Sequence, residues 1–213
     1  MHIAEGVLDT PTLLAAAGCT AFGLTIGLRR LTPRTLPTAA LFAAVFFLVG
    51  TIHIPIGVAS VHLILNGLIG LLLGWLAFPV IFVALALQAL LFSFGGFTSL
   101  GANTLLMALP AVIAGLTLRP LLQQPSSRPK LLIVGASAAT IGILGATLLA
   151  AIMLWSTGGA TLSSLISLFV AAQAPVWLIE AIVTALTVGL LGKARDAAPA
   201  AQAAVITVGA ITL

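Results

Sequence analysis

Long apolar runs follow one another along the chain, separated by short segments that hold most of the charged residues. A helix needs about 20 apolar residues, and not fewer than about 17, to cross the hydrocarbon core of a bilayer. The runs therefore predict an all-α fold, a polytopic membrane bundle of about seven transmembrane helices. The expected spans are residues 12–28, 36–52, 60–76, 78–94, 103–118, 131–155 and 174–191.

Two apolar segments near the C-terminus do not fit this series. Residues 161–173 are too short to span a bilayer, and Pro175 separates them from the last run. We expect them to lie in the membrane interface or to form an additional half-helix. Residues 197–213 are an Ala-rich apolar tail to which we assign no role. The pattern thus predicts a single transmembrane domain over residues 1–196, followed by that tail.

The composition excludes a water-soluble protein. Hydrophobic residues make up 61% of the 213-residue chain and charged residues 6%, whereas soluble domains contain about 25% charged residues. The formal net charge of +4 does not indicate a nucleic-acid partner, because the cations lie in a few short segments between apolar runs. The bilayer therefore has to cover most of the surface.

The positions of the cations predict the orientation in the membrane. With seven spans, all eight Lys and Arg residues fall on one side, and the N-terminus falls on the other. Segments rich in Lys and Arg stay in the cytoplasm, so we expect the N-terminus outside. The cations are Arg29, Arg30, Arg34, Arg119, Arg128, Lys130, Lys193 and Arg195.

The three histidines, His2, His53 and His62, would then all lie at or near the outer face. A histidine in second position offers three nitrogens to one metal: the Met1 amine, its own amide nitrogen, and its imidazole Nδ1. Deprotonating the amide requires a strongly polarising metal that favours planar nitrogen ligands, namely Cu(II) or Ni(II). One corner of the square remains, and either His53 or His62 can fill it.

This chemistry requires a free amine on Met1. The start of the chain has no basic region, and Glu5 stands where a secretory signal peptide carries cations. We therefore expect the encoded N-terminus to be the mature one.

Three sequence blocks resemble one known family. Residues 1–6, Met-His-Ile-Ala-Glu-Gly, resemble the start of the NikM/CbiM proteins, the substrate-binding membrane subunits of energy-coupling-factor nickel and cobalt importers. Residues 53–67 are similar to the second block of that family. Residues 88–92 and 95–104 are similar to the third. The resemblance covers about residues 1–120, and beyond them only the hydropathy agrees.

The resemblance implies a metal site and a function. It implies that the Met1 amine, the amide and imidazole of His2, and the His62 imidazole hold the metal. The form Ser-Val-His-Leu-Ile-Leu-Asn-Gly at residues 60–67 looks more like the nickel members, so Ni(II) is the expected substrate, with Co(II) possible. The chain would capture the ion outside a prokaryotic cytoplasmic (inner) membrane, as a multi-pass binding subunit and not as an enzyme.

The resemblance also implies partners, since the chain contains no G-x-x-x-x-G-K-[ST] phosphate-binding motif. ATPase subunits would act through a transmembrane coupling subunit, with a small accessory membrane subunit in addition.

Other polar residues near the outer face are candidates to orient the imidazoles or to hold the N-terminal segment in place. Glu180 is the one acid inside a predicted span, and the sequence assigns it no role. The candidates for the supporting role are His53, Asn66, Gln88, Thr98, Ser99 and Asn103.

Three other functions are weighed against metal capture for import. A stand-alone secondary metal permease should carry acids deep in several spans, yet the first six predicted spans contain no Asp or Glu. An intramembrane metalloenzyme would need a motif such as H-E-x-x-H, which the sequence lacks. A purely structural membrane subunit would bind no metal.

Overall fold

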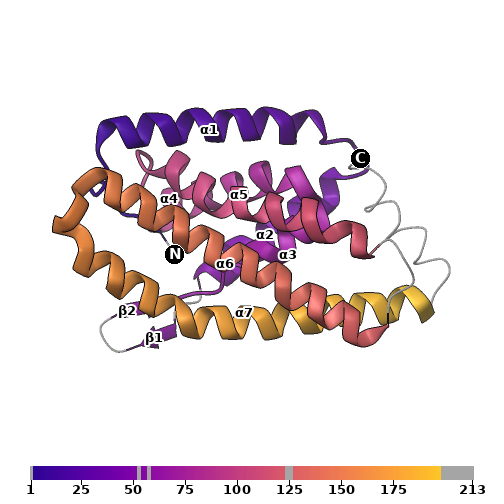
Figure 1. Ribbon diagram of the computed structural model, residues 1–213. Helices are drawn as coiled ribbons and strands as arrows, with labels where there is room; N and C mark the ends of the chain where they lie inside the picture. The colour runs from indigo at the N-terminus through magenta and orange to yellow at the C-terminus, as the bar shows by residue number, and fades with distance from the viewer. Residues whose placement is uncertain (1, 52–53, 57–58, 123–126, 198–213) are drawn as a thin grey trace.

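The computed structural model describes residues 2–51, 54–56, 59–122 and 127–197 of the chain. Its described part is an elongated bundle of α-helices whose long axes run roughly side by side (Figure 1). The α-helices are α1 (Thr10–Arg29), α2 (Leu36–Thr51), α3 (Asn66–Leu73), α4 (Ala77–Phe92), α5 (Leu100–Leu118), α6 (Arg128–Gly158) and α7 (Ser163–Ala197). Three 3-10 turns, η1 (Gly74–Leu76), η2 (Arg119–Leu122) and η3 (Gly159–Leu162), and a hairpin of β1 (Ile54–Ile56) and β2 (Ala59–Val61) complete the described elements.

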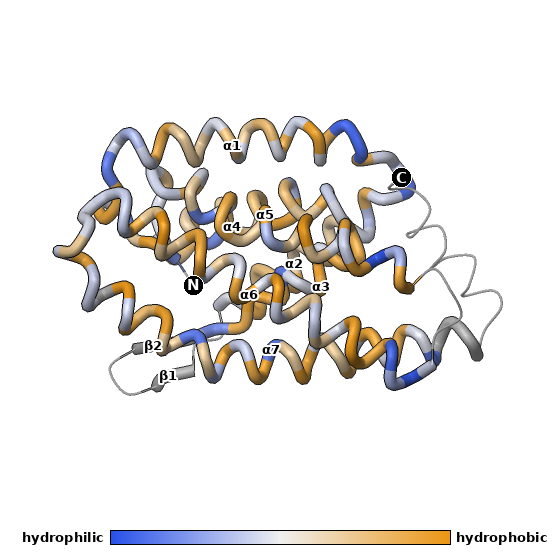
Figure 2. The backbone as a smooth tube through the Cα atoms, viewed as in Figure 1, coloured by the Kyte–Doolittle hydropathy of each residue, from blue (hydrophilic) through white to orange (hydrophobic). Residues whose placement is uncertain are grey.

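The predicted class of an all-α membrane bundle is confirmed. By length and composition, five helical stretches of the described chain are apolar enough to cross a membrane: Thr10–Arg29, Asn66–Phe92, Leu100–Leu122, Arg128–Leu162 and Ile166–Lys193. The second of them consists of α3, η1 and α4. The α2 helix is apolar but shorter, with 16 residues. Large apolar side chains on the outside of the bundle, such as Leu14, Phe22 and Leu148, remain exposed where lipid would cover them. Figure 2 shows that apolar residues make up most of the length of the helices.

The prediction of a third full-length span over residues 60–76 is wrong. The chain is extended from Ala59 and becomes helical only at Asn66, so α3 is a half-helix of eight residues. The α3 helix runs alongside α5: the Asn66 side chain contacts Met107, and Gly70 packs against Ala111. Hydropathy alone could not detect this break, because a buried extended segment is as apolar as a buried helix.

The chain reverses direction after α3. Gly74 has a φ of +57°, a left-handed conformation that glycine adopts without steric cost. The α4 helix then runs back toward the other end of the bundle, where Gln88 meets His2. A side chain on Gly70 would clash with the Ala111 carbonyl, so glycine also allows α3 to lie directly against α5.

The C-terminal prediction also needs correction. Residues 161–173 are not a separate half-helix, because from Ser163 they form the first part of the 35-residue α7, with Pro175 inside that helix. A proline removes one backbone hydrogen bond from a helix. The α6 and α7 helices pack extensively against each other. The tail falls mostly outside the described residues, since the structure describes the chain only as far as residue 197.

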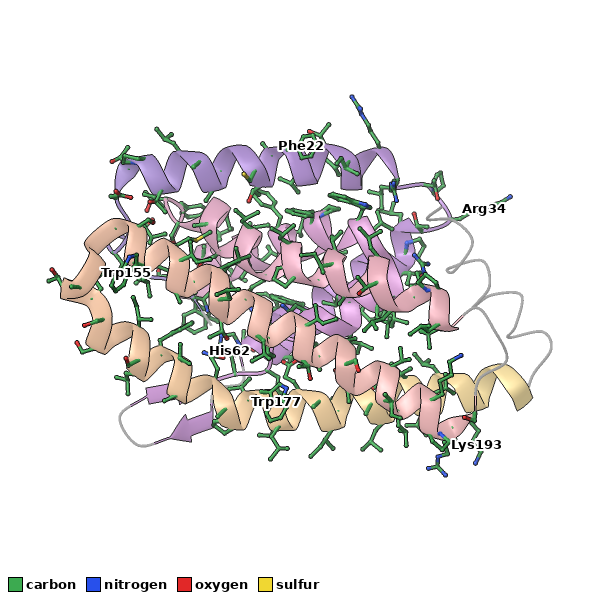
Figure 3. The ribbon with its side chains drawn as sticks, in the orientation of Figure 1. Phe22, Arg34, His62, Trp155, Trp177 and Lys193 are labelled. Carbon is green, nitrogen blue, oxygen red and sulfur yellow. The ribbon has the colours of Figure 1, made fainter. Side chains whose placement is uncertain are left out.

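The cations gather at one end of the bundle. They lie at the end of α1, the start of α2, the end of α5, the start of α6 and the end of α7. Figure 3 shows Arg34 and Lys193 at this end and Trp155 at the opposite end. The segment that follows His2 lies at the end away from the cations, since Asp9 contacts Thr157 near the end of α6. This arrangement separates the cations from the N-terminal segment, as the N-outside prediction requires.

We predict that a membrane-impermeant maleimide added outside cells labels a cysteine at Ala160 and not one at Ser127. Both residues are exposed, and they flank α6 at opposite ends. Because Cys19 is exposed in the wild-type chain, the experiment uses a Cys19→Ser background. Permeabilised cells, in which both positions should react, are the control. If only the Ser127→Cys variant were labelled in intact cells, the N-terminus would lie in the cytoplasm and the predicted orientation would be wrong.

Candidate metal-binding site

The N-terminal segment is built into the bundle. Ile3 and Leu8 are buried, and Asn103 of α5 holds the Ile3 peptide from both sides. The Ile3 amide donates to Asn103 Oδ1 at 2.8 Å, and Asn103 Nδ2 donates to the Ile3 carbonyl at 3.0 Å. Chain termini are usually poorly ordered unless such bonds tie them down. The Asn103 clamp therefore fixes the backbone beside His2.

Ser99 and Thr98 support this clamp from the loop before α5. Ser99 Oγ accepts from Asn103 Nδ2 at 3.1 Å and donates to the Gly95 carbonyl at 2.6 Å. Glu5 Oε1 accepts from the amide and the hydroxyl of Thr98, at 2.8 and 3.1 Å. These hydrogen bonds lower the pKa of the Glu5 carboxyl, so it is ionised at neutral pH. The loop and the N-terminal segment are thus joined at two points.

His2 is oriented by Gln88. Its Nε2 lies 3.0 Å from Gln88 Oε1, and Gln88 Nε2 donates to the Phe47 carbonyl at 3.1 Å. The second bond fixes which end of the Gln88 amide faces His2, so His2 Nε2 must be the donor. The lone pair of the neutral ring then sits on Nδ1. This is the nitrogen that the predicted chelate at the N-terminus requires.

His62 lies next to His2. The two ring centroids are 5.0 Å apart and the ring planes are tilted by 33°. His62 Nδ1 is 3.1 Å from the carbonyl oxygen of Leu63 and therefore donates to it, which puts the lone pair on Nε2. Burial lowers the pKa of His62, which favours the neutral imidazole that can bind a metal. Figure 3 shows His62 inside the bundle, in the half away from Arg34 and Lys193.

Asn66 fixes the backbone after His62, although the helix predicted over residues 60–76 does not join them. The two residues do not share a helix, because α3 begins at Asn66 and His62 belongs to the extended segment before it. Asn66 is fully buried, and its Nδ2 donates to the carbonyls of Met107 and Gly142 at 3.1 Å each. Asn66 thereby ties the start of α3 to α5 and α6.

The structure brings together most of the predicted site. His2 and His62 lie side by side, Gln88 contacts His2, and the Asn103 clamp holds the neighbouring peptide. Met1 and His53 lie outside the described residues. Within the described ranges no group of three or more His, Cys, Asp or Glu could hold a metal.

Sequence reasoning missed two contacts of the site. It gave Glu5 no role at the site, although Glu5 joins the N-terminal segment to Thr98. It also did not include Phe94, whose ring centroid lies 6.1 Å from that of His2. Glu5 lies within the first sequence block together with His2, and Phe94 lies between the two parts of the third block.

We predict that Asn103→Ala weakens Ni(II) binding by about 10- to 100-fold, the usual effect of losing a residue that orients a ligand. The substitution removes both hydrogen bonds to Ile3 and releases the segment that carries His2. Competition with a chromophoric chelator measures the affinity. Thr104→Val is the matched control, because Thr104 is buried next in sequence and donates only within α5, to Leu100. Equal affinities for the two variants would contradict the clamp.

Comparison with known proteins extends beyond the blocks that carry the resemblance. The family model for the cobalt uptake substrate-specific transmembrane region, CbiM, matches residues 2–198. The chain is 48% identical over 193 residues to a putative metal transport protein of Haemophilus influenzae, across 91% of this chain and 94% of that protein. It is 34% identical over 160 residues to the fused nickel transport protein NikMN of Rhodobacter capsulatus, across 71% of this chain and 46% of that protein.

A solved structure agrees with these matches. The crystal structure of a transition metal transporter superimposes with a TM-score of 0.72 at 27% identity, covering 92% of this chain and 94% of that one. The family model spans the N-terminal segment, the extended segment with His62, and each of the α-helices that the structure describes. The multi-pass membrane bundle described above is therefore a member of the CbiM family of cobalt uptake substrate-specific transmembrane proteins.

Proposed function

We propose that this chain captures Ni(II) outside the cell and delivers it across the membrane as the substrate-binding subunit of an ATP-driven importer. Co(II) is a second possible substrate. Transport of cobalt or nickel is what the family and the relatives support, since CbiM is described by cobalt and NikMN by nickel. The observation that carries the proposal is the pair of adjacent imidazoles, with His2 and His62 ring centroids 5.0 Å apart.

Four nitrogens would bind the ion. The Met1 amine and the His2 amide close a five-membered ring with the metal, and the amide and Nδ1 of His2 close a six-membered ring. Nε2 of His62 fills the fourth corner. Gln88 and the Leu63 carbonyl hold the other nitrogen of each imidazole, as is usual for histidines that bind metals. This all-nitrogen set suits Ni(II), which favours planar nitrogen coordination.

The energy for transport would come from other subunits. The chain has no phosphate-binding loop of the Walker type, so we assign ATP hydrolysis to separate ATPase subunits that act through a transmembrane coupling subunit. A small accessory membrane subunit would complete the assembly. The fused relative NikMN is consistent with such partners, because this chain matches only 46% of its length.

Elemental analysis tests this function directly. Protein purified with Met1 as its first residue, incubated with Ni(II) or Co(II) and passed over a desalting column, should retain one metal ion per chain. The His2→Ala variant should retain none. A wild-type protein that retains no metal, or a His2→Ala variant that retains a full equivalent, would contradict the proposal.

A further inference from the structure

We propose that Glu180, an acid in the interior of α7, is the positioning residue that fixes His62 for metal capture. This inference rests on the proposed function, because it concerns the same site. Glu180 is fully buried, and its carboxylate reaches across the bundle to the extended segment that follows His62. No sequence signal connects the two residues, which lie more than one hundred positions apart.

The contact is made to backbone amides. Glu180 Oε1 accepts from the Leu65 amide at 2.7 Å and also from the Ile64 amide. Both amides stand ahead of α3, where the helix supplies them with no carbonyl partner. Leu65 is the N-cap residue of α3, and no side chain caps the helix there. Within the membrane an unsatisfied amide is costly, and Glu180 supplies the acceptor for these two amides.

The conformation held by Glu180 is one that leucine rarely adopts. Leu65 has a φ of +53°, in the left-handed region. Such a residue persists only where its surroundings hold it in place. The amide of Leu65 is held by Glu180. The next residue, Asn66, is held by its side-chain hydrogen bonds to the carbonyls of Met107 and Gly142. The left-handed residue turns the extended segment into α3.

His62 depends on this backbone. Its Nδ1 donates to the carbonyl of the next residue, Leu63, so the orientation of the ring follows the main chain. The next amide along, that of Ile64, is the first one held by Glu180. A metal ligand must stay within about 0.5 Å of its productive position. Releasing the amides of Ile64 and Leu65 would therefore move the His62 ring away from the fourth corner of the square.

Only one carboxylate oxygen performs this function. Glu180 Oε2 is buried and has no hydrogen-bond partner within the described part of the chain. Holding the amides of Ile64 and Leu65 thus needs an acceptor at the reach of a Glu side chain, and it does not need the negative charge. Glutamine supplies the same acceptor at the same distance. Aspartate keeps the charge but is one methylene too short.

The test compares Glu180→Gln with Glu180→Asp. Glu180→Gln should bind Ni(II) as tightly as the wild type and give the same visible spectrum. Glu180→Asp should bind about 10- to 100-fold more weakly, as expected when a supporting partner is lost. Thr184→Val is the matched control and should behave as wild type, because Thr184 is buried one turn further along the same face of α7 and its hydroxyl has no hydrogen-bond partner among the residues that the structure describes. The opposite ranking, or equal affinities for the Gln and Asp variants, would overturn the assignment.

Hydrogen exchange of the metal-free proteins separates this inference from the proposed function. The amides of Ile64 and Leu65 should exchange faster in Glu180→Asp than in the wild type, Glu180→Gln or Thr184→Val. This result does not require metal binding. A wild-type protein that binds no Ni(II) would refute the metal site, but the contact between Glu180 and the two amides could still be measured. If the exchange rates of these amides were unchanged in Glu180→Asp, the positioning role of Glu180 would be refuted whatever the metal content.

Discussion

Two residues added ahead of Met1 are expected to abolish nickel binding. A Gly-Ser extension converts the Met1 amine into an amide and moves the histidine from second to fourth position. The fused five- and six-membered rings then have no terminal amine to close on. The histidine cannot slide to a new register, because the Asn103 clamp holds Ile3 and Gln88 holds His2. A two-residue extension is needed, since a histidine in third position would create a different chelate with the new terminal amine.

The control restores the native end. A protease site placed so that cleavage leaves Met1 as the first residue should return one nickel per chain to the same preparation. Metal content before and after cleavage measures the effect. An extended protein that binds nickel with wild-type affinity would show that the Met1 amine is not a ligand.

His62→Ala is expected to remove most metal binding while the protein still folds. Only one corner of the square is left for a second imidazole, so only one further histidine should be essential. His62 is buried beside His2 on a backbone fixed by Asn66, and this firm support is what a ligand requires. His53→Ala should weaken capture by about tenfold, the effect of losing a supporting residue.

Metal content is measured on both variants after size-exclusion chromatography has established intact protein. The outcome that contradicts the assignment is a His53→Ala protein without metal together with a fully loaded His62→Ala protein. In that case His53 would be the fourth ligand. Equal and partial loss in both variants would mean that neither imidazole alone completes the square.

Hydropathy predicted much of the fold, because the bilayer requires long apolar segments. The predicted spans over residues 103–118 and 131–155 lie within α5 and α6. The errors arose where an apolar segment is not one complete helix or extends further than expected. Leu65 interrupts the third span with a left-handed residue, and Pro175 lies inside α7 instead of ahead of it. Neither a rare backbone conformation nor the packing around a proline can be inferred from apolar character.

The candidate site could be proposed from the sequence where its chemistry is local to the chain. A histidine in second position has a chelating geometry that depends only on its neighbours, so the sequence alone makes His2 a candidate ligand. Gln88 and Asn103 could be predicted as supports because they fall at the expected outer ends of spans. Glu180 could not be assigned, because its partners are the amides of Ile64 and Leu65. Backbone amides are present at every residue, so a sequence contains no sign of which ones a distant acid will bind.

The electronic state of nickel in the loaded wild-type protein tests the four-nitrogen site most directly. Four nitrogens, one of them an anionic amide, form a strong planar ligand field around Ni(II). Protein with Met1 as its first residue, loaded with one nickel per chain, should be yellow-orange and diamagnetic, as square-planar low-spin Ni(II) is. Visible absorption and magnetic susceptibility of the same sample measure both properties. A paramagnetic, octahedral nickel spectrum from intact protein would contradict the site.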